Sequence, residues 1–125
     1  MNKIHTDKAP AAVGPYSQAI KINGMVFTSG QIALDPATGD IVGTDIKTQA
    51  TQVMQNLMEV LKAAGTDKKN TVKTTCFLSN MDDFAAFNEV YAQYFTEAPA
   101  RSCVAVKTLP KNVLCEVEAI ALVEG

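Results

Sequence analysis

The last apolar run of the chain, residues 114–123, constrains the fold more than any other segment. It reads Leu-Cys-Glu-Val-Glu-Ala-Ile-Ala-Leu-Val, and in a β-strand successive side chains point to opposite faces of the sheet. One face of this strand is wholly apolar and the other mixes apolar residues with two carboxylates: Val117, Ala119, Ala121 and Val123 against Glu116, Glu118, Ile120 and Leu122. A sheet that contains such a strand needs a cover on both faces.

Two segments have the three- and four-residue apolar spacing of helices, and these could cover one face. The first, residues 45–64, has Thr44 or Asp45 as its N-cap and Gly65 as its C-terminal stop. The second occupies residues 80–98, and its apolar stripe is aromatic: Phe84, Phe87, Tyr91, Tyr94 and Phe95. Aromatic residues at this spacing are typical of a core.

Four further segments are predicted strands: residues 16–22, 25–29, 72–78 and 101–106. The pair Asn23-Gly24 between the first two predicts a tight hairpin, because both residues tolerate positive φ. The predicted order is therefore β-β-α-β-α-β-β, a mixed α+β sheet with two helices on one face. The second face keeps its apolar residues, which predicts self-association.

Composition and charge narrow the class of protein. The 125 residues are 47% hydrophobic and 19% charged, which is typical of one globular domain covering residues 1–125. The net charge of −2 and the scattered basic residues argue against nucleic acid as the main partner.

The sequence also indicates a cytoplasmic protein that is not bound to a membrane. Residues 1–10 are polar and do not resemble a signal peptide, and no window approaches the ~18 apolar residues of a membrane span. The three cysteines, Cys76, Cys103 and Cys115, lack the spacing of a disulfide framework or a zinc site.

The sequence lacks the common catalytic and nucleotide-binding motifs. Its one histidine, His5, lies in the polar N-terminal segment and is expected to be a solvated surface residue. A histidine-based triad or metal site is therefore not expected, and we expect neither a metal nor an organic cofactor.

Two features could carry chemistry: Arg101, at the start of a predicted strand, and the carboxylates of Glu116 and Glu118. They could form a structural ion pair at a sheet edge or at a seam between subunits. Alternatively, Arg101 could grip a carboxylate with its planar fork while a glutamate with a raised pKa activates water. Cys103, predicted on the face of Arg101, is a third candidate as a nucleophile. Spacing alone does not show whether the two faces coincide.

Five segments, taken in order, resemble the pattern of the RidA (YjgF) family. They are Gly14-Pro15-Tyr16-Ser17-Gln18-Ala19, Phe27-Thr28-Ser29-Gly30-Gln31-Ile32, Asn88-Glu89-Val90-Tyr91, Pro99-Ala100-Arg101-Ser102-Cys103-Val104 and Glu116-Val117-Glu118-Ala119-Ile120-Ala121. The resemblance implies a chorismate-mutase-like α+β fold and a homotrimer with a cleft between each pair of subunits. It also implies hydrolytic deamination of 2-imino or enamine acids, such as 2-iminopropanoate and 2-iminobutanoate, to 2-oxo acids and ammonia.

The resemblance assigns a role to each matching residue. Arg101 matches the arginine that binds the substrate carboxylate, and Glu116 matches the glutamate that holds the attacking water. Cys103 matches a position whose backbone N–H meets the ligand. The remaining matches line the cleft: Tyr16, Ser29, Gly30 and Asn88.

Two other functions remain open. The same cleft could serve a small-acid-binding or regulatory trimer without catalysis. An RNA-directed activity has also been claimed for relatives, but the acidic balance and the lack of an aromatic and basic stripe argue against it here.

Overall fold

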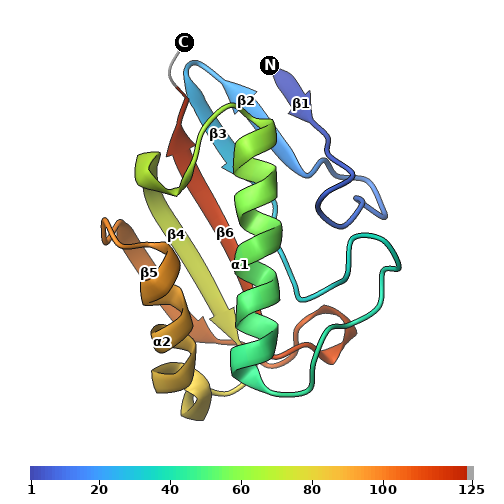
Figure 1. Ribbon diagram of the computed structural model, residues 1–125, viewed down its shortest axis with the longest axis vertical. Helices are drawn as coiled ribbons and strands as arrows, with labels where there is room; N and C mark the ends of the chain where they lie inside the picture. The colour runs from blue at the N-terminus through green and yellow to red at the C-terminus, as the bar shows by residue number, and fades with distance from the viewer. Residues whose placement is uncertain (124–125) are drawn as a thin grey trace.

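The computed structural model describes residues 1–123 and shows one six-stranded sheet with two helices on one face (Figure 1). The strands are β1 (Asn2–Ile4), β2 (Ala19–Ile22), β3 (Met25–Thr28), β4 (Thr71–Leu78), β5 (Ala100–Ala105) and β6 (Cys115–Leu122). The helices are α1 (Ile46–Ala63) and α2 (Phe84–Tyr94), with 3-10 turns at Lys68–Asn70, Met81–Asp83 and Pro110–Asn112. The predicted α+β class and the helices on one face are confirmed.

The strand order is β1-β2-β3-β6-β4-β5, so the last strand of the chain lies inside the sheet. β4 and β5 run parallel, and all other neighbouring strands run antiparallel. The parallel pair is connected through α2, which leaves β4 and returns to β5 as a crossover helix (Figure 1). The sheet is therefore mixed, as expected.

The predicted element order omitted the first strand. β1 pairs with the outer edge of β2, with Ile4 opposite Ala19, so the observed order is β-β-β-α-β-α-β-β. Three residues with a single apolar side chain give no alternation that a sequence could reveal. The strand predicted at residues 16–22 also begins later, at Ala19, because the preceding residues belong to a loop.

Local signals in the sequence were reliable. Asp45 caps α1, and its Oδ2 accepts a hydrogen bond from the Thr48 N–H at 3.1 Å. Gly65 follows the helix with φ +88°, the left-handed conformation that a C-terminal stop requires. Asn23 and Gly24 both have positive φ in the hairpin between β2 and β3.

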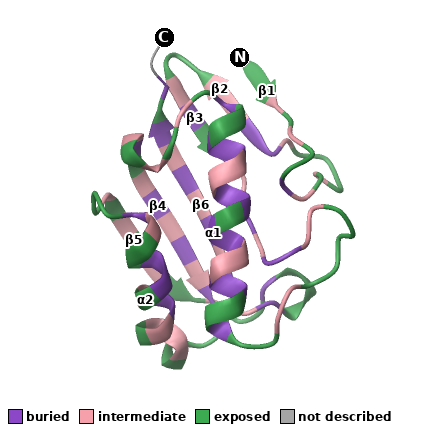
Figure 2. Ribbon diagram, in the orientation of Figure 1, coloured by how far each residue is buried: buried purple, intermediate pink, exposed green. Residues whose placement is uncertain are grey.

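The core lies between the helices and the sheet. The apolar stripe of α1 is buried, and so are Phe87, Tyr91 and Phe95 of the aromatic stripe. The buried apolar residues of α1 are Ile46, Ala50, Val53, Met54, Leu57, Val60 and Leu61. Along β6 the burial alternates as predicted: Cys115, Val117, Ala119 and Ala121 are buried (Figure 2).

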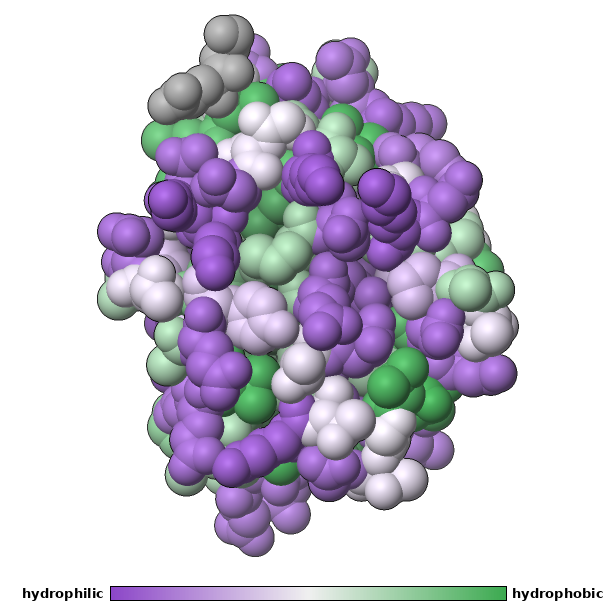
Figure 3. Space-filling model, in the orientation of Figure 1, coloured by the Kyte–Doolittle hydropathy of each residue, from purple (hydrophilic) through white to green (hydrophobic). Residues whose placement is uncertain are grey.

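The two faces of the molecule differ in polarity. The side carrying the helices presents mainly hydrophilic residues to solvent (Figure 3). On the open face of the sheet, Phe27 is 42% exposed, Val104 48% and Leu122 50%. The register places Phe27 directly opposite Ile120, and Val104 directly opposite Phe77, so apolar side chains pair at two places on this face. Within residues 1–123, no helix has the length and the apolar character to span a membrane.

Candidate functional site

Arg101 extends from β5 towards α2, where three residues hold its guanidinium group. Its Nη1 donates a hydrogen bond to Asn88 Oδ1 at 2.7 Å. Its Cζ lies 4.7 Å from the ring centroid of Tyr91 and 5.5 Å from that of Phe84, so the planar group is held by cation–π contacts. Asn88 and Tyr91 are three residues apart on one face of α2, which lets both reach the same side chain.

The guanidinium has no carboxylate partner in the part of the chain that the structure describes. Across residues 1–123 the ion pairs are His5 with Asp7 and Lys47 with Glu89. The interpretation of an ion pair between Arg101 and Glu116 or Glu118 of the same chain is therefore wrong. Most of the five N–H donors of Arg101 are available to an external acceptor.

The aromatic support of Arg101 is itself fixed. The Tyr91 hydroxyl and Thr74 Oγ1 are 2.7 Å apart, and Thr74 is fully buried in β4. The Tyr91 ring also packs against Phe95, with ring centroids 4.9 Å apart. Beside Arg101 lies a cavity of about 360 Å³, which we call the arginine pocket; it is lined by Asn88, Tyr91, Ala92, Phe95, Ala98, Pro99 and Arg101.

Glu116 lies on β6 and points to the open face of the sheet. It is half-buried, and burial raises the pKa of its carboxyl group, with the nearby charge of Glu118 raising it further. The carboxylate packs directly against Gly30, because a Cβ at this position would overlap the Glu116 side chain. Gly30 is therefore required for the space it leaves open.

Tyr16, Ser29 and Gly30 lie around the same carboxylate. Ser29 is fixed by two hydrogen bonds: its Oγ donates to the Ser17 carbonyl at 2.6 Å, and its N–H donates to the Gln18 carbonyl at 2.9 Å. These residues line a cavity of about 670 Å³, which we call the glutamate pocket. Its other lining residues include Ala11, Val13, Ile32, Lys111 and Glu118.

Within one chain, the two pockets open on opposite faces of the sheet. Arg101 is opposite Thr74 in the register of β4 and β5, and Glu116 is opposite Phe77 in the register of β4 and β6. Side chains paired in this way share a face, and Thr74 and Phe77 are an odd number of residues apart on one strand. The two predicted catalytic side chains therefore do not meet within a single subunit.

Cys103 lies on the helix-covered face with Arg101 and is opposite Cys76 in the sheet. Burial raises the pKa of the Cys103 thiol, and the opposing influence of Arg101 is smaller. Burial also raises the pKa of Cys76 to about 12 and that of Cys115 to about 12. The thiol of Cys103 is thus the protonated, weakly nucleophilic form at neutral pH.

We predict that Cys103→Ser retains most of any deaminase activity. The pKa of this thiol is raised, and His5, the single histidine, hydrogen-bonds Asp7 on the exposed N-terminal segment. The backbone N–H, the group implied to meet the ligand, is unchanged by the substitution. The measurement is kcat/KM of the variant, with mass spectrometry of the wild type during turnover. A substrate adduct on Cys103, together with an inactive serine variant, would establish thiol catalysis instead.

Two residues of the site escaped prediction. Tyr91 was interpreted as a core aromatic, and it is both a core residue and the platform beneath Arg101. Its spacing of three residues from Asn88 was the signal available in the sequence. Lys111 lines the glutamate pocket from a turn with φ +56°, and nothing in the sequence indicated this. Residues 1–123 contain no cluster of three His, Cys, Asp or Glu side chains that could hold a metal.

The mixed sheet, the crossover helix and the two pockets define a small α+β protein of the RidA class. The family model described as endoribonuclease L-PSP matches residues 6–123, and the chain belongs to this family. The resemblance identified in the sequence is thereby confirmed.

Curated relatives match over nearly their full length. A RutC family protein of Synechocystis is 56% identical, with 98% of this chain and 96% of the relative covered. AldR of Lactococcus lactis, which carries a regulator's name, is 52% identical, with 100% of both covered. A mouse protein named 2-iminobutanoate/2-iminopropanoate deaminase is 48% identical, with 95% and 89% covered. The family and its deaminase-named members support reactive-intermediate deaminase activity.

Solved structures agree with this assignment. RidA of an Antarctic Psychrobacter has a TM-score of 0.94 at 42% identity, with 98% of this chain and 100% of that chain covered. TdcF of E. coli, solved with bound serine, has a TM-score of 0.94 at 44% identity, with 99% and 100% covered.

Proposed function

We propose that this protein hydrolyses 2-imino acids such as 2-iminopropanoate and 2-iminobutanoate to 2-oxo acids and ammonia in the cytoplasm. The observation that carries the proposal is the guanidinium of Arg101, which is fixed by Asn88 and Tyr91 yet lacks a carboxylate partner in residues 1–123. A planar fork held in this way suits the carboxylate of a small acid. The name of the mouse relative and the serine bound to TdcF support the same ligand class.

The proposed reaction needs two protein groups. Arg101 binds the substrate carboxylate, and Glu116 holds a water molecule next to the imine carbon. Water adds to that carbon while its proton passes to Glu116, which returns the proton to the nitrogen. The new hydroxyl group then gives its proton to the nitrogen and becomes the carbonyl of the 2-oxo acid, while the C–N bond breaks and ammonia leaves. The raised pKa of Glu116 makes its carboxylate a stronger proton acceptor than that of an unperturbed glutamate. An imine is already electrophilic, so positioning supplies much of the catalysis.

The direct test generates 2-iminobutanoate with a threonine dehydratase and measures 2-oxobutanoate release. Substoichiometric protein should accelerate release. A regulatory trimer that only binds small acids is the second candidate, favoured by the regulator's name of AldR. Such a protein would leave the release rate unchanged while still binding serine or 2-oxobutanoate in calorimetry, and that result would reject the deaminase proposal.

Because Arg101 and Glu116 face opposite sides of the sheet, we propose that each active site combines the arginine pocket of one subunit with the glutamate pocket of the next. The apolar open face, with Phe27, Val104 and Leu122 exposed, provides a surface for assembly. A ring of three subunits would form three equivalent sites.

We predict that sedimentation equilibrium at micromolar concentration gives three times the 13.4 kDa of one chain.

Subunit mixing then tests the shared site. Arg101→Ala and Glu116→Gln proteins, each nearly inactive alone, should recover about a quarter of wild-type activity after joint refolding at equal amounts. Half of the arginine pockets and half of the glutamate pockets are then intact, and a working site needs one of each. A monomer, or a mixture without recovery, contradicts the shared site.

We predict that Gly30→Ala lowers kcat/KM by about tenfold or more, because the methyl group displaces the carboxylate that positions water. The fold should persist, since Gly30 lies at the pocket surface. Gly39→Asn is the control: a Cβ there meets nothing within 4 Å, and Asn tolerates the positive φ. Equal activity in Gly30→Ala and the wild type would show that the position of Glu116 is unimportant.

A further inference from the structure

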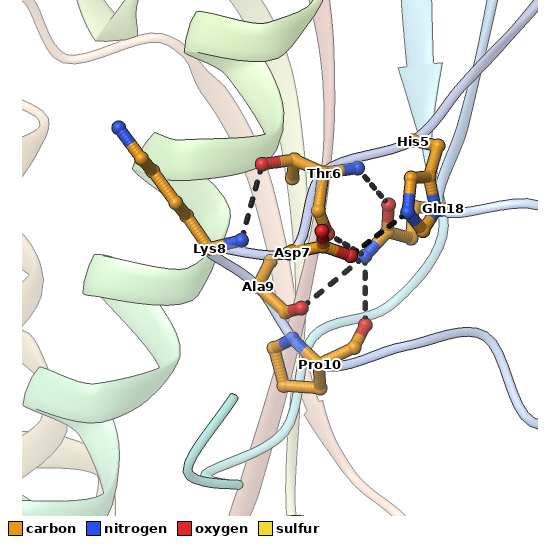
Figure 4. Close-up of polar contacts among 7 residues, drawn as sticks. All are labelled: His5, Thr6, Asp7, Lys8, Ala9, Pro10 and Gln18. Atoms are coloured by element: carbon orange, nitrogen blue, oxygen red, sulfur yellow. Dashed lines mark hydrogen bonds and ion pairs between the residues drawn. The ribbon is translucent and has the colours of Figure 1, made fainter. Parts of the chain in front are cut away.

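The buried side chain of Gln18 forms hydrogen bonds with the backbone of residues 6–10, a segment that precedes it in the chain (Figure 4). Gln18 is 2% exposed, and its Oε1 accepts a hydrogen bond from the Thr6 N–H at 2.7 Å. Its Nε2 donates towards three carbonyl oxygens: Thr6 at 3.0 Å, Ala9 at 3.4 Å and Pro10 at 2.8 Å. Both ends of the amide are therefore used, and all of its partners are backbone groups.

The Gln18 amide adds one more pair of hydrogen bonds at the end of the pairing between β1 and β2. The backbone pairing of β1 with β2 ends where Ile4 is opposite Ala19. Beyond that point, the Gln18 side chain bonds both the N–H and the carbonyl of Thr6, which are the groups that a neighbouring strand would otherwise bond. The chain between these two points, residues 7–17, is closed at its base by Gln18, and we call it the clamped loop.

The far part of the clamped loop forms one wall of the glutamate pocket. Ala11, Val13 and Tyr16 line this pocket together with Glu116. Tyr16 is 51% exposed and Val13 77% exposed, so neither side chain anchors the loop in the core. No helix or strand occurs in residues 7–17. Ala9, at the base of the loop, is the residue of this segment that is buried in the core, so the position of the wall depends on how the base is held.

Gln18 also connects the clamped loop to the other side of the pocket. Its carbonyl accepts the Ser29 N–H at 2.9 Å, and the neighbouring Ser17 carbonyl accepts Ser29 Oγ–H at 2.6 Å. Ser29 precedes Gly30, the residue against which Glu116 packs. One residue thus holds the loop through its side chain and holds the end of β3 through its backbone.

We propose that Gln18 is a positioning residue for the reaction: its amide holds the clamped loop as the wall that restricts water around Glu116. This inference rests on the proposed function, because it assigns the wall a role in placing one attacking water. Loss of the amide frees the base of the loop, the wall moves away, and bulk water reaches the carboxylate.

The experiment compares Gln18→Met and Gln18→Glu with wild type. Methionine keeps the length and removes all four contacts, and glutamate keeps an acceptor for Thr6 but places oxygen against three carbonyl groups. Gln55→Glu, on an exposed position of α1, is the matched control for the added charge. Circular dichroism shows which variants fold. Because methionine and glutamate disrupt the contacts of Gln18 in different ways, either variant is sufficient for the test if the other does not fold.

The first readout is the rate of trypsin cleavage after Lys8, an exposed lysine in the clamped loop, relative to the rate of cleavage after Lys107. Both Gln18 variants should raise the Lys8 cleavage rate by about tenfold, because several buried hydrogen bonds are lost, with Lys107 cleavage unchanged. The Gln55→Glu control should cleave like wild type. Unchanged cleavage after Lys8 would mean that Gln18 does not hold the loop, and the inference would fail.

The second readout, which combines the kinetic constants with the titration of Glu116, distinguishes a role in positioning water from a purely structural role of Gln18. The variants should lose about tenfold in kcat with little change in KM, since Arg101 still binds the carboxylate. Carbon-detected NMR of Glu116 should show its pKa falling towards the ordinary range as water enters. Faster Lys8 cleavage with unchanged kcat and unchanged Glu116 titration would overturn the positioning role. If the wild type proves inactive, the proposed function fails, while cleavage and the Glu116 titration still decide whether Gln18 fixes this wall.

Discussion

Arg101→Ala is expected to lower kcat/KM for 2-iminobutanoate by at least about a hundredfold, because a charge-assisted bidentate contact with the substrate carboxylate is lost. Arg101→Lys should also be poor, since an ammonium group has no planar fork and cannot use the Tyr91 and Asn88 support in the same way. Both variants should keep the fold and the assembly, because Arg101 forms no ion pair within residues 1–123. The dehydratase-coupled assay measures the effect, with the exposed Lys107→Ala as control.

Chemical modification gives an independent test, because Arg101 is the only arginine in the sequence. An arginine-selective dicarbonyl such as phenylglyoxal should therefore inactivate the enzyme when one arginine per chain has been modified. The product 2-oxobutanoate should protect against it. Full modification with full retention of activity, or near wild-type rates in both Arg101 variants, would exclude the carboxylate-binding role.

The second large effect concerns the two neighbouring carboxylates of β6. Glu116→Gln should lower kcat by about a hundredfold or more, because an amide cannot accept the proton of the attacking water. Glu118→Gln should have a much smaller effect: Glu118 lines the glutamate pocket, but the carboxylate that packs against Gly30 belongs to Glu116. The two variants carry the same change in charge on the same strand face and therefore control for each other. The reverse ranking would identify Glu118 as the base.

The pH profile should carry the signature of Glu116. A general base acts in its deprotonated form, so the rate falls as pH decreases through the pKa of that group. Burial and Glu118 raise the pKa of Glu116 above its ordinary 4.5, which places this acid limb at a higher pH than that of an unperturbed glutamate. The limb should be absent from the residual activity of Glu116→Gln and shifted to lower pH in Glu118→Gln, where the neighbouring charge is gone. A limb that is identical in all three proteins would contradict the assignment.

Sequence reasoning succeeded where the signal was local. The cap at Asp45, the stop at Gly65 and the hairpin at Asn23-Gly24 each depend on a few neighbouring residues, and each was found as predicted. The alternation of β6 was equally clear in the sequence, because α1 covers one side of this strand (Figure 1) and successive residues are alternately buried and more exposed.

The relation between Arg101 and Glu116 could not be obtained in this way. Whether two strands present their residues on the same face depends on the register that each forms with β4, and that register is set by contacts between distant segments. The sequence does not reveal strand β1 or the hydrogen bonds of the Gln18 amide, for the same reason. Both exist only when residues 2–10 pack beside Gln18 and β2. The polar sequence of residues 1–10 therefore gave no indication that this segment is bonded to Gln18, at the base of the loop that lines the glutamate pocket.

The central position of β6 has a consequence for how the chain folds during synthesis. β1, β2 and β3 form one half of the sheet and β4 and β5 the other, and β6 alone joins them. A ribosome completes β6 after the other five strands, so the two halves share no strand pairing until residues 115–122 have emerged. Such non-local pairing slows folding, and β3 and β4 expose unpaired edges in the meantime. We therefore expect the two halves of the sheet to join only when β6 is available to pair with both.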